Sequence, residues 1–457
     1  MPLAQRIEAQ LQQAVPGARF GLVVATEDSK EILAIAPEQR FVPASNTKLF
    51  TTAVAFAALS GLEAPDAEGG AAVRLDGRDV VLEGRGDARL SSAADCRTDC
   101  LAELADAVAA RTRSVRNVVG DDSLFPDERW SPGMSWNNIP TPSGTGASAL
   151  TVDDNELVLT VTPRRVGETP TIDGFAYFTI ENRAITVASG ETTLDFQRMP
   201  GSRAVRVTGT IAAGSKKHEL RLGIDDPAHY AAWRLKGLLE ARGLRVTGEV
   251  QVRHRPLSGF DDPSRRGTVA ARLPQRPASL ARLIPPPLAE DIAAINKVSQ
   301  NLHSDLLLRR VGLRIGTGSI ADGIAFVTSM LAKAGLARAH FDFADGSGMS
   351  TYNRVAPRGV VRFLGWTQAQ AWGAAWRATL PIAGVDGTLD DRFKGTPLEG
   401  RLFAKTGTLN ATSALSGFLV AKSGRTLIFS AFANDVPAGM SAVPALDAAL
   451  IRIAAEN

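Results

Sequence analysis

The sequence is poor in the residues that most often mark a metal site or a redox centre. Its 457 residues include 2 cysteines and 5 histidines, and none of them has the spacing of a zinc site or of an H-E-x-x-H motif. We therefore expect no metal and no cofactor. Cys96 and Cys100 lie close together and either form a local disulfide or remain two thiols, because so short a loop closes only with suitable backbone geometry.

Long hydrophobic runs and a strong excess of one charge are also missing. No apolar run reaches the ~20 residues of a membrane-spanning helix, so no transmembrane segment is expected. The net charge is +3 and the basic residues are dispersed, which argues against a nucleic-acid partner. With 44% hydrophobic and 22% charged residues, the chain can bury a globular core, and its length suits roughly three domains of ordinary size.

Three short motifs occur in one order along the chain. Ser45-Asn46-Thr47-Lys48 is followed by Ser299-Gln300-Asn301 and then by Lys405-Thr406-Gly407. S-x-x-K, S-x-N and K-T-G together are the signature of an active site that forms an acyl-serine. Each motif alone has a simpler explanation as a helix N-cap, a polar turn or the end of a strand. Their joint occurrence, in this order, favours catalysis.

Ser45 and Lys48 are expected to form the nucleophile and its base. Three residues apart at the start of a predicted helix, they would share one helix face. The lysine can take the serine proton only as a neutral amine, so its pKa must be lowered by burial or by a nearby cation, for which Lys405 is a candidate. The backbone N–H groups of Ser45 and Thr408 are candidate oxyanion donors.

The other motif residues are expected to serve the leaving group and the substrate. Ser299 can relay a proton to a leaving amine, and Asn301 can hold both Lys48 and a substrate amide. Lys405 and the hydroxyls of Thr406 and Thr408 suit a terminal carboxylate, and we include Gly407 in this binding segment.

Strand and helix patterns at both ends of the chain predict one α+β unit, an α/β sandwich, with a β-rich insertion. Strands are expected at 19–26, 31–36, 402–406, 415–422 and 425–433, and helices at 5–14 and 445–455. The middle alternates in the manner of strands, with turn residues at short spacing and a helix at 227–242. We expect a discontinuous catalytic domain of residues 1–65 and 268–457, and an inserted region of residues 66–267 built as two small domains.

The chain resembles, along nearly its whole length, the low-molecular-mass class C penicillin-binding proteins, the D-alanyl-D-alanine carboxypeptidase/endopeptidases. The segments that carry the resemblance are 43–49, 120–123, 146–150, 297–302, 345–353, 380–384, 386–389 and 404–409. The resemblance implies a penicilloyl-serine transferase (β-lactamase-like) catalytic domain with a large insertion. It also implies a serine D-Ala-D-Ala carboxypeptidase, with endopeptidase action as an extension.

This resemblance implies peptidoglycan stem peptides as substrates and β-lactam antibiotics as ligands that acylate Ser45. Such a substrate lies outside the cytoplasm. Residues 1–6 lack the apolar stretch of a secretory signal. We therefore expect a periplasmic or other extracytoplasmic mature form whose signal peptide is not part of this sequence.

Two positions depart from the family pattern, and they bear on substrate choice. Thr145 stands where an aromatic residue often precedes Gly-Ala, and Thr351 where a basic residue often follows the Asp-Gly-Ser-Gly-x-Ser run. We expect weak selectivity for the third residue of the stem peptide. The alternatives with the same chemistry are a β-lactamase, an esterase or a D-amino-acid amidase. A catalytically silent wall-binding module would not need the intact set of polar motif residues.

Overall fold

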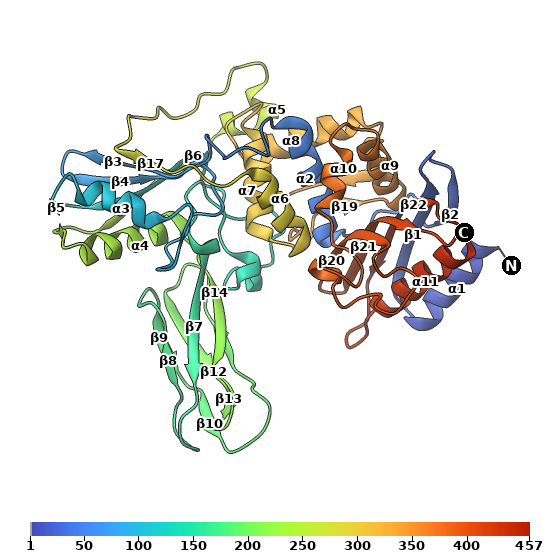
Figure 1. Cartoon of the computed structure of the whole chain (residues 1–457), viewed down its shortest axis with the longest axis horizontal. Helices are drawn as coiled ribbons and strands as arrows, with labels where there is room; N and C mark the ends of the chain where they lie inside the picture. Colours follow the sequence, from blue (N-terminus) through green and yellow to red (C-terminus); the bar gives the residue numbers. More distant parts are fainter. Residues whose placement is uncertain (1) are drawn as a thin grey trace.

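The computed structural model describes residues 2–457, and its two ends meet in one antiparallel sheet (Figure 1). The strand order is β2-β1-β22-β21-β20. The strands are β1 (Arg19–Thr26), β2 (Glu31–Ile35), β20 (Leu402–Leu409), β21 (Thr412–Val420) and β22 (Thr426–Asn434). Leu22 of β1 lies opposite Ala431 of β22, so segments about as far apart as the chain allows are hydrogen-bonded neighbours.

Helices cover both faces of this sheet, which explains why β1 reads as a continuous hydrophobic run. Leu22 and Val24 point into a core shared with α1 (Leu3–Ala14) and α11 (Val443–Glu456). Val23 and Ala25 point into the opposite core. That second core contains α2 (Thr47–Ala58), α6 (Leu288–Lys297), α7 (Asn301–Gly312), α8 (Ile320–Lys333), α9 (Pro357–Gln368) and α10 (Gly373–Ala378). The predicted α+β sandwich is confirmed.

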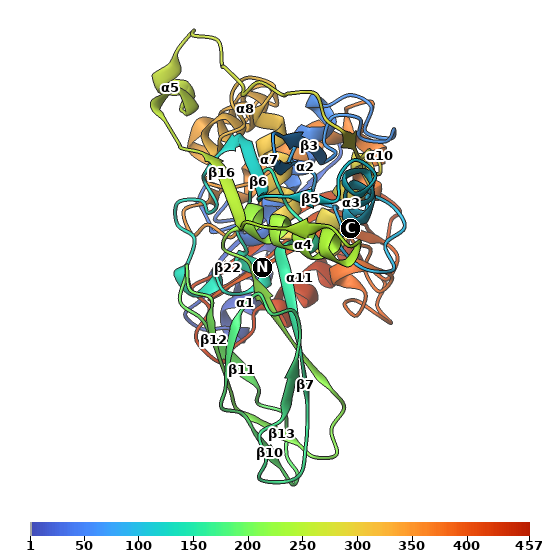
Figure 2. The same cartoon turned by 90° about the vertical axis from the view of Figure 1, so that its left-hand side faces the viewer.

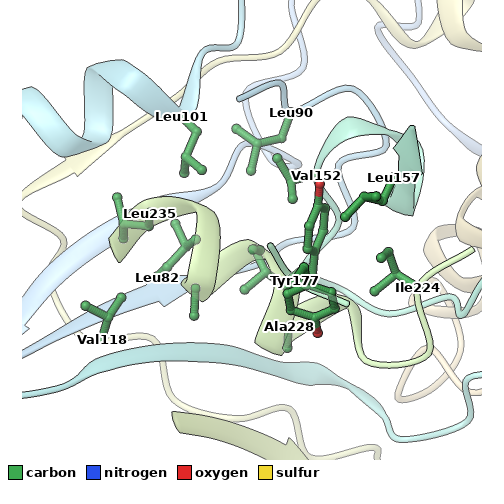
Figure 3. Packing of buried hydrophobic residues seen from close by; sticks show 14 of the residues in the cluster. Leu82, Leu90, Leu101, Val118, Val152, Leu157, Tyr177, Ile224, Ala228 and Leu235 are labelled. Atoms are coloured by element: carbon green, nitrogen blue, oxygen red, sulfur yellow. The ribbon is translucent and has the colours of Figure 1, made fainter. Parts of the chain in front are cut away.

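A second mixed sheet, in the order β16-β6-β4-β3-β17, forms the centre of the inserted region. Its strands are β3 (Ala72–Asp76), β4 (Asp79–Glu83), β6 (Val118–Pro126), β16 (Val250–Arg255) and β17 (Ala281–Arg282). Side chains of α3 (Leu101–Ala109) and α4 (Pro227–Ala241) pack on it around Leu82 and Val118 (Figure 3). Because β17 pairs with β3, this sheet includes chain beyond residue 267. The division into domains stays a prediction.

A long β arm extends from this region, away from the first sheet (Figures 1 and 2). Its ladders have the orders β14-β7-β8, β11-β12-β9 and β10-β13. The strands are β7 (Glu156–Thr162), β8 (Thr171–Asp173), β9 (Thr179–Asn182), β10 (Ile185–Val187), β11 (Asp195–Gln197), β12 (Ala204–Thr208), β13 (Thr210–Ala212) and β14 (His218–Gly223).

Several short elements and one disulfide complete the fold. The short strands and helix are β5 (Ser114–Val115), β15 (Arg245–Val246), β18 (Phe341–Asp342), β19 (Arg354–Val355) and α5 (Pro263–Arg266). Cys96 and Cys100 form a disulfide, the first of the two alternatives left open by the sequence. Among residues 2–457, we find no helix with the length and apolar content needed to cross a membrane.

Candidate active site

The nucleophile segment is a tight turn and not the first turn of an α-helix. Ser45 lies in a 3-10 turn, Ala44–Asn46, that runs directly into α2 at Thr47, so Ser45 lies at a helix start, as the sequence predicts. Ala44 has a φ of +48°, a left-handed conformation that is uncommon for a residue with a side chain. The side-chain Nδ2 of Asn46 donates a 2.8 Å hydrogen bond to the backbone carbonyl of Lys405, which connects the turn to β20.

Lys48 is fully buried behind Ser45 and lies at the centre of the hydrogen-bond network. Its Nζ donates to Ser45 Oγ at 2.9 Å, to Asn301 Oδ1 at 2.6 Å and to the Ser347 carbonyl at 2.7 Å. Burial lowers the pKa of Lys48 to about 8, and the nearby charges of Asp305 and Asp345 oppose this shift. The sequence left burial and a nearby cation as alternative causes, and burial is the one that lowers the pKa of Lys48.

The two polar side chains of the second motif, Ser299 and Asn301, form hydrogen bonds with different lysines. Ser299 adopts a left-handed φ of +65° between α6 and α7. Its Oγ accepts a 2.9 Å hydrogen bond from Lys405 Nζ. Asn301, the first residue of α7, accepts from Lys48 and donates to the carbonyl of Ser143 at 3.0 Å. A carbonyl of the inserted region therefore orients a motif side chain.

The third motif lies on β20 and faces the nucleophile turn. Lys405 is buried, and burial together with the charge of Lys48 lowers its pKa well below the usual value. Thr406 Oγ1 donates to Thr388 Oγ1 at 2.7 Å, while the Thr408 side chain is exposed. A Cβ on Gly407 would lie 2.7 Å from the carbonyl oxygen of Pro43, so glycine permits β20 to approach the turn. The predicted roles of Lys405, Thr406, Gly407 and Thr408 in binding a terminal carboxylate stay predictions.

Two carboxylates near Lys48 were not among the predicted site residues. Asp305 Oδ1 accepts from the backbone N–H groups of Gly346 at 2.9 Å and Ser347 at 3.0 Å, and burial followed by the charge of Asp345 raises its pKa to about 7. Asp345 accepts from the N–H of Gly348 at 2.8 Å. The Asp-Gly-Ser-Gly run marks Asp345 in the sequence as part of a family motif, whereas no sequence pattern marks Asp305.

The two positions that depart from the family pattern are both engaged with backbone. Thr145 is buried, and its Oγ1 donates to the carbonyl of Asn155 at 2.7 Å and accepts from the N–H of Ile224 at 2.9 Å. Thr351 is exposed, and its Oγ1 donates to the carbonyl of Gly133 at 3.1 Å.

This fold and this arrangement of two serines, two lysines and an asparagine define an acyl-serine enzyme of the penicillin-binding class. The family model described as D-Ala-D-Ala carboxypeptidase 3 (S13) matches residues 3–457. The chain belongs to this family, as the sequence predicted, and is a serine-type carboxypeptidase by membership.

Similar proteins agree with this assignment. A D-alanyl-D-alanine carboxypeptidase of Actinomadura sp. is 32% identical over 476 residues, covering 99% of this chain and 84% of the relative. D-alanyl-D-alanine carboxypeptidase DacB of Haemophilus influenzae is 26% identical, covering 94% and 88%. The crystal structure of penicillin binding protein 4 from Haemophilus influenzae matches with a TM-score of 0.79 at 22% identity, covering 97% of this chain and 98% of that chain. This last likeness concerns the fold.

Proposed function

We propose that the chain hydrolyses the terminal D-Ala from peptidoglycan stem peptides that end in D-Ala-D-Ala. The observation that carries the proposal is the 2.9 Å hydrogen bond between Ser45 Oγ and the buried Nζ of Lys48. The names of the relatives support this substrate over those of a β-lactamase, an esterase or an amidase. An extracytoplasmic location follows from the substrate and is part of the proposal.

In the proposed acylation, neutral Lys48 accepts the proton of Ser45 as the oxygen attacks the carbonyl of the penultimate D-Ala. The N–H groups of Ser45 and Thr408 stabilise the oxyanion, because fixed backbone donors need no reorganisation as charge develops. Ser299, held by Lys405, relays the proton taken from Ser45 to the leaving D-Ala amine as the C–N bond breaks. Lys405, with Thr406 and Thr408, holds the terminal carboxylate.

In the proposed deacylation, water attacks the acyl-Ser45 ester and gives up a proton to Lys48, which returns it to the Ser45 oxygen as the ester bond breaks and the shortened peptide leaves with a new carboxylate. A cross-linked peptide has the same D-Ala carbonyl as its acyl donor, so endopeptidase action needs no further catalytic group. A β-lactam presents a carbonyl and a carboxylate to the same groups and acylates Ser45.

Intact-protein mass spectrometry with benzylpenicillin tests this proposal. We expect a gain of one ligand mass on the peptide that contains Ser45, and hydrolysis of a D-Ala-D-Ala peptide with release of D-Ala. Ser45→Ala should lose both, whereas the exposed Ser60→Ala, just after α2, should keep both. Acylation of Ser45→Ala at the wild-type rate would refute the assignment.

A further inference from the structure

A cavity of about 880 Å³ lies in the inserted region, and its lining comes from segments other than the three motifs. Its walls are formed by α4, the start of β7 and the segment between β8 and β9; α4 crosses above the upper end of β7 (Figure 2). The volume lies within the ~300–1,000 Å³ of small-ligand sites.

An aromatic ring is held in a fixed, exposed position at this cavity. Phe175 keeps 51% of its surface exposed. The guanidinium of Arg234 lies 3.7 Å from the centre of its ring, and Trp233 packs against it edge-on at 6.2 Å between centroids. Because both neighbours restrict the ring, its open surface is an ordered apolar shelf on which a ligand can stack.

The charged groups of the cavity balance and are already paired. The acidic lining residues are Asp153, Asp154, Glu156 and Glu240, and the basic ones are Arg221, Arg234, Lys236 and Arg242. Their ion pairs are Arg221–Glu156 at 3.2 Å, Arg234–Asp153 at 3.6 Å, Lys236–Glu240 at 2.6 Å, Arg242–Asp106 at 2.5 Å and His303–Asp154 at 2.7 Å. Such a lining favours a neutral ligand with many hydroxyl or amide groups, because a charged ligand would have to break these pairs.

Gly237 opens the cavity wall in the interior of α4. A Cβ at this position would meet nothing within 4 Å, so packing does not require glycine there. A glycine inside a helix costs about 1 kcal/mol relative to alanine. Since the fold gains nothing from it, the missing side chain leaves room for a ligand to approach the helix backbone.

The floor of the cavity is linked to the helix that carries Asn301. Asp153, Asp154 and Asn155 all have left-handed φ values, of 51°, 54° and 50°. Three such residues in succession are strained and need strong local support. Asp154 finds part of that support in His303 Nε2 at 2.7 Å, two residues after Asn301 in α7.

We propose that this cavity binds glycan, a neutral chain of N-acetylated sugars with apolar ring faces and polar edges. The proposal rests on the proposed function, which makes the substrate a peptide attached to such a chain. Stacking on Phe175 and hydrogen bonds to the paired charges along the rim would hold the polymer while its stem peptide reaches Ser45.

Titration of the full chain with a peptide-free β-1,4-linked N-acetylglucosamine tetramer, followed by calorimetry or ligand-observed NMR, tests the proposal. We expect saturable binding with a Kd of about 1 mM or tighter. Phe175→Ala and Gly237→Leu should weaken it at least tenfold, one ~1.4 kcal/mol step. The matched control is Phe260→Ala, which removes another exposed aromatic ring, 63% exposed, and should leave binding unchanged.

Activity measurements separate this proposal from the proposed function. Acylation by benzylpenicillin and hydrolysis of a short stem peptide should be unchanged in the Phe175 and Gly237 variants. Absence of tetramer binding, or binding that both variants retain at full strength, would overturn the glycan site even if Ser45 is acylated normally. Normal tetramer binding with no acylation of Ser45 would leave the glycan site standing and refute the catalytic assignment.

Discussion

The two buried lysines of the site form hydrogen bonds with different polar side chains. Lys48 contacts Ser45 and Asn301, and Lys405 contacts Ser299. Burial is the first cause of the lowered pKa of each amine, and the charge of Lys48 adds to it at Lys405. Burial disfavours an ammonium group, so the low-dielectric site favours the neutral amine that the proposed base role of Lys48 requires.

Lys48→Arg should lower acylation by about 10²–10⁴-fold, the usual contribution of a general base, because arginine stays protonated in proteins. In the wild type, the neutral fraction of Lys48 grows as pH rises through its pKa of about 8. The acylation rate should therefore increase across that pH and then level off. Stopped-flow acylation by a chromogenic β-lactam measures both effects.

The exposed Lys422→Arg, in the turn before β22, is the control for this prediction and should behave as wild type. A thermal melt of Lys48→Arg shows whether the buried site tolerates the larger side chain. A loss of less than tenfold in a folded variant would point to another base.

Stem-peptide selectivity should be weak because the guanidinium groups of Arg354 and Arg358, the first two arginines after Thr351 in the sequence, are occupied. Arg354 donates to the carbonyls of Thr351 at 2.5 Å and Asn353 at 2.8 Å. Arg358 forms ion pairs with two glutamates, including Glu31 at 2.5 Å. A neutral hydrogen bond contributes about 1 kcal/mol, against roughly 1.5–3 kcal/mol for one to a charged group.

We therefore expect kcat/KM for stems with meso-diaminopimelate and with L-lysine to differ by less than about tenfold, or 1.4 kcal/mol. Matched synthetic peptides that differ only at this residue provide the measurement. A preference of a hundredfold or more for diaminopimelate would mean that a charged pocket exists elsewhere in the site.

The nucleophile turn is shaped by glycines on two neighbouring segments. A Cβ on Gly348, in the loop before β19, would lie 1.9 Å from the carbonyl oxygen of Ala44. On the other side, Gly407 of β20 lets that strand approach Pro43. The turn is therefore clamped between a loop and a strand, and its position depends on the absence of two side chains.

Gly348→Ala should reduce acylation by at least tenfold, since the added carbon must displace the turn that carries Ser45. The matched control is Gly424→Ala in the turn before β22. Gly424 has a φ of +86° against +91° for Gly348, but nothing lies within 4 Å of its Cβ position. Both variants bear the cost of a left-handed alanine, about 1–2 kcal/mol. Equal acylation by the two variants would contradict the clamp.

Regular elements could be predicted from local patterns, whereas the geometry of the site could not. The bounds of β1 match the prediction, because its apolar run and the polar turn after it are local signals. Ser45 was expected at a helix start, but the 3-10 turn that forms this start depends on contacts with β20 and the 345–350 loop, which no local pattern shows. Asp305 approaches Lys48 only through tertiary packing, and the pairing of β17 with β3 is likewise set by long-range contacts.

Buried charged groups join the inserted region to the catalytic helices. Arg309 of α7 donates to the carbonyl of Pro126 at 2.7 Å, and Arg266 of α5 donates to Asp322 of α8 at 2.5 Å. Removal of one partner of a buried ion pair such as Arg266–Asp322 typically costs about 3–5 kcal/mol, because a charge is left buried and unpaired. These contacts hold the end of β6 and α5 against α7 and α8.

A buried pair of acids beside the disulfide gives the whole molecule a dependence of stability on pH. Asp87 and Asp99 are each 5% exposed. Burial, and then the charge of Asp99, raises the pKa of Asp87 well above its usual value. Asp87 Oδ2 and both carboxylate oxygens of Asp99 are buried and otherwise unpaired, and a proton on Asp87 can be donated to Asp99. The folded state therefore holds this proton more tightly than the unfolded chain does.

Asp87→Asn should stabilise the protein relative to wild type, and increasingly so as pH rises. In the wild type the folded state binds more protons, so the free energy of unfolding falls by up to about 1.4 kcal/mol per pH unit. The fall begins above the unfolded pKa of about 3.9 and continues to the raised folded pKa. Asparagine keeps the donor and cannot ionise. Urea unfolding of both proteins between pH 4.5 and 8, with the disulfide intact, should show a gap that widens with pH. Asp95→Asn, exposed in the same loop, should show none, and a constant gap for Asp87→Asn would mean that Asp87 is ionised in the folded protein throughout.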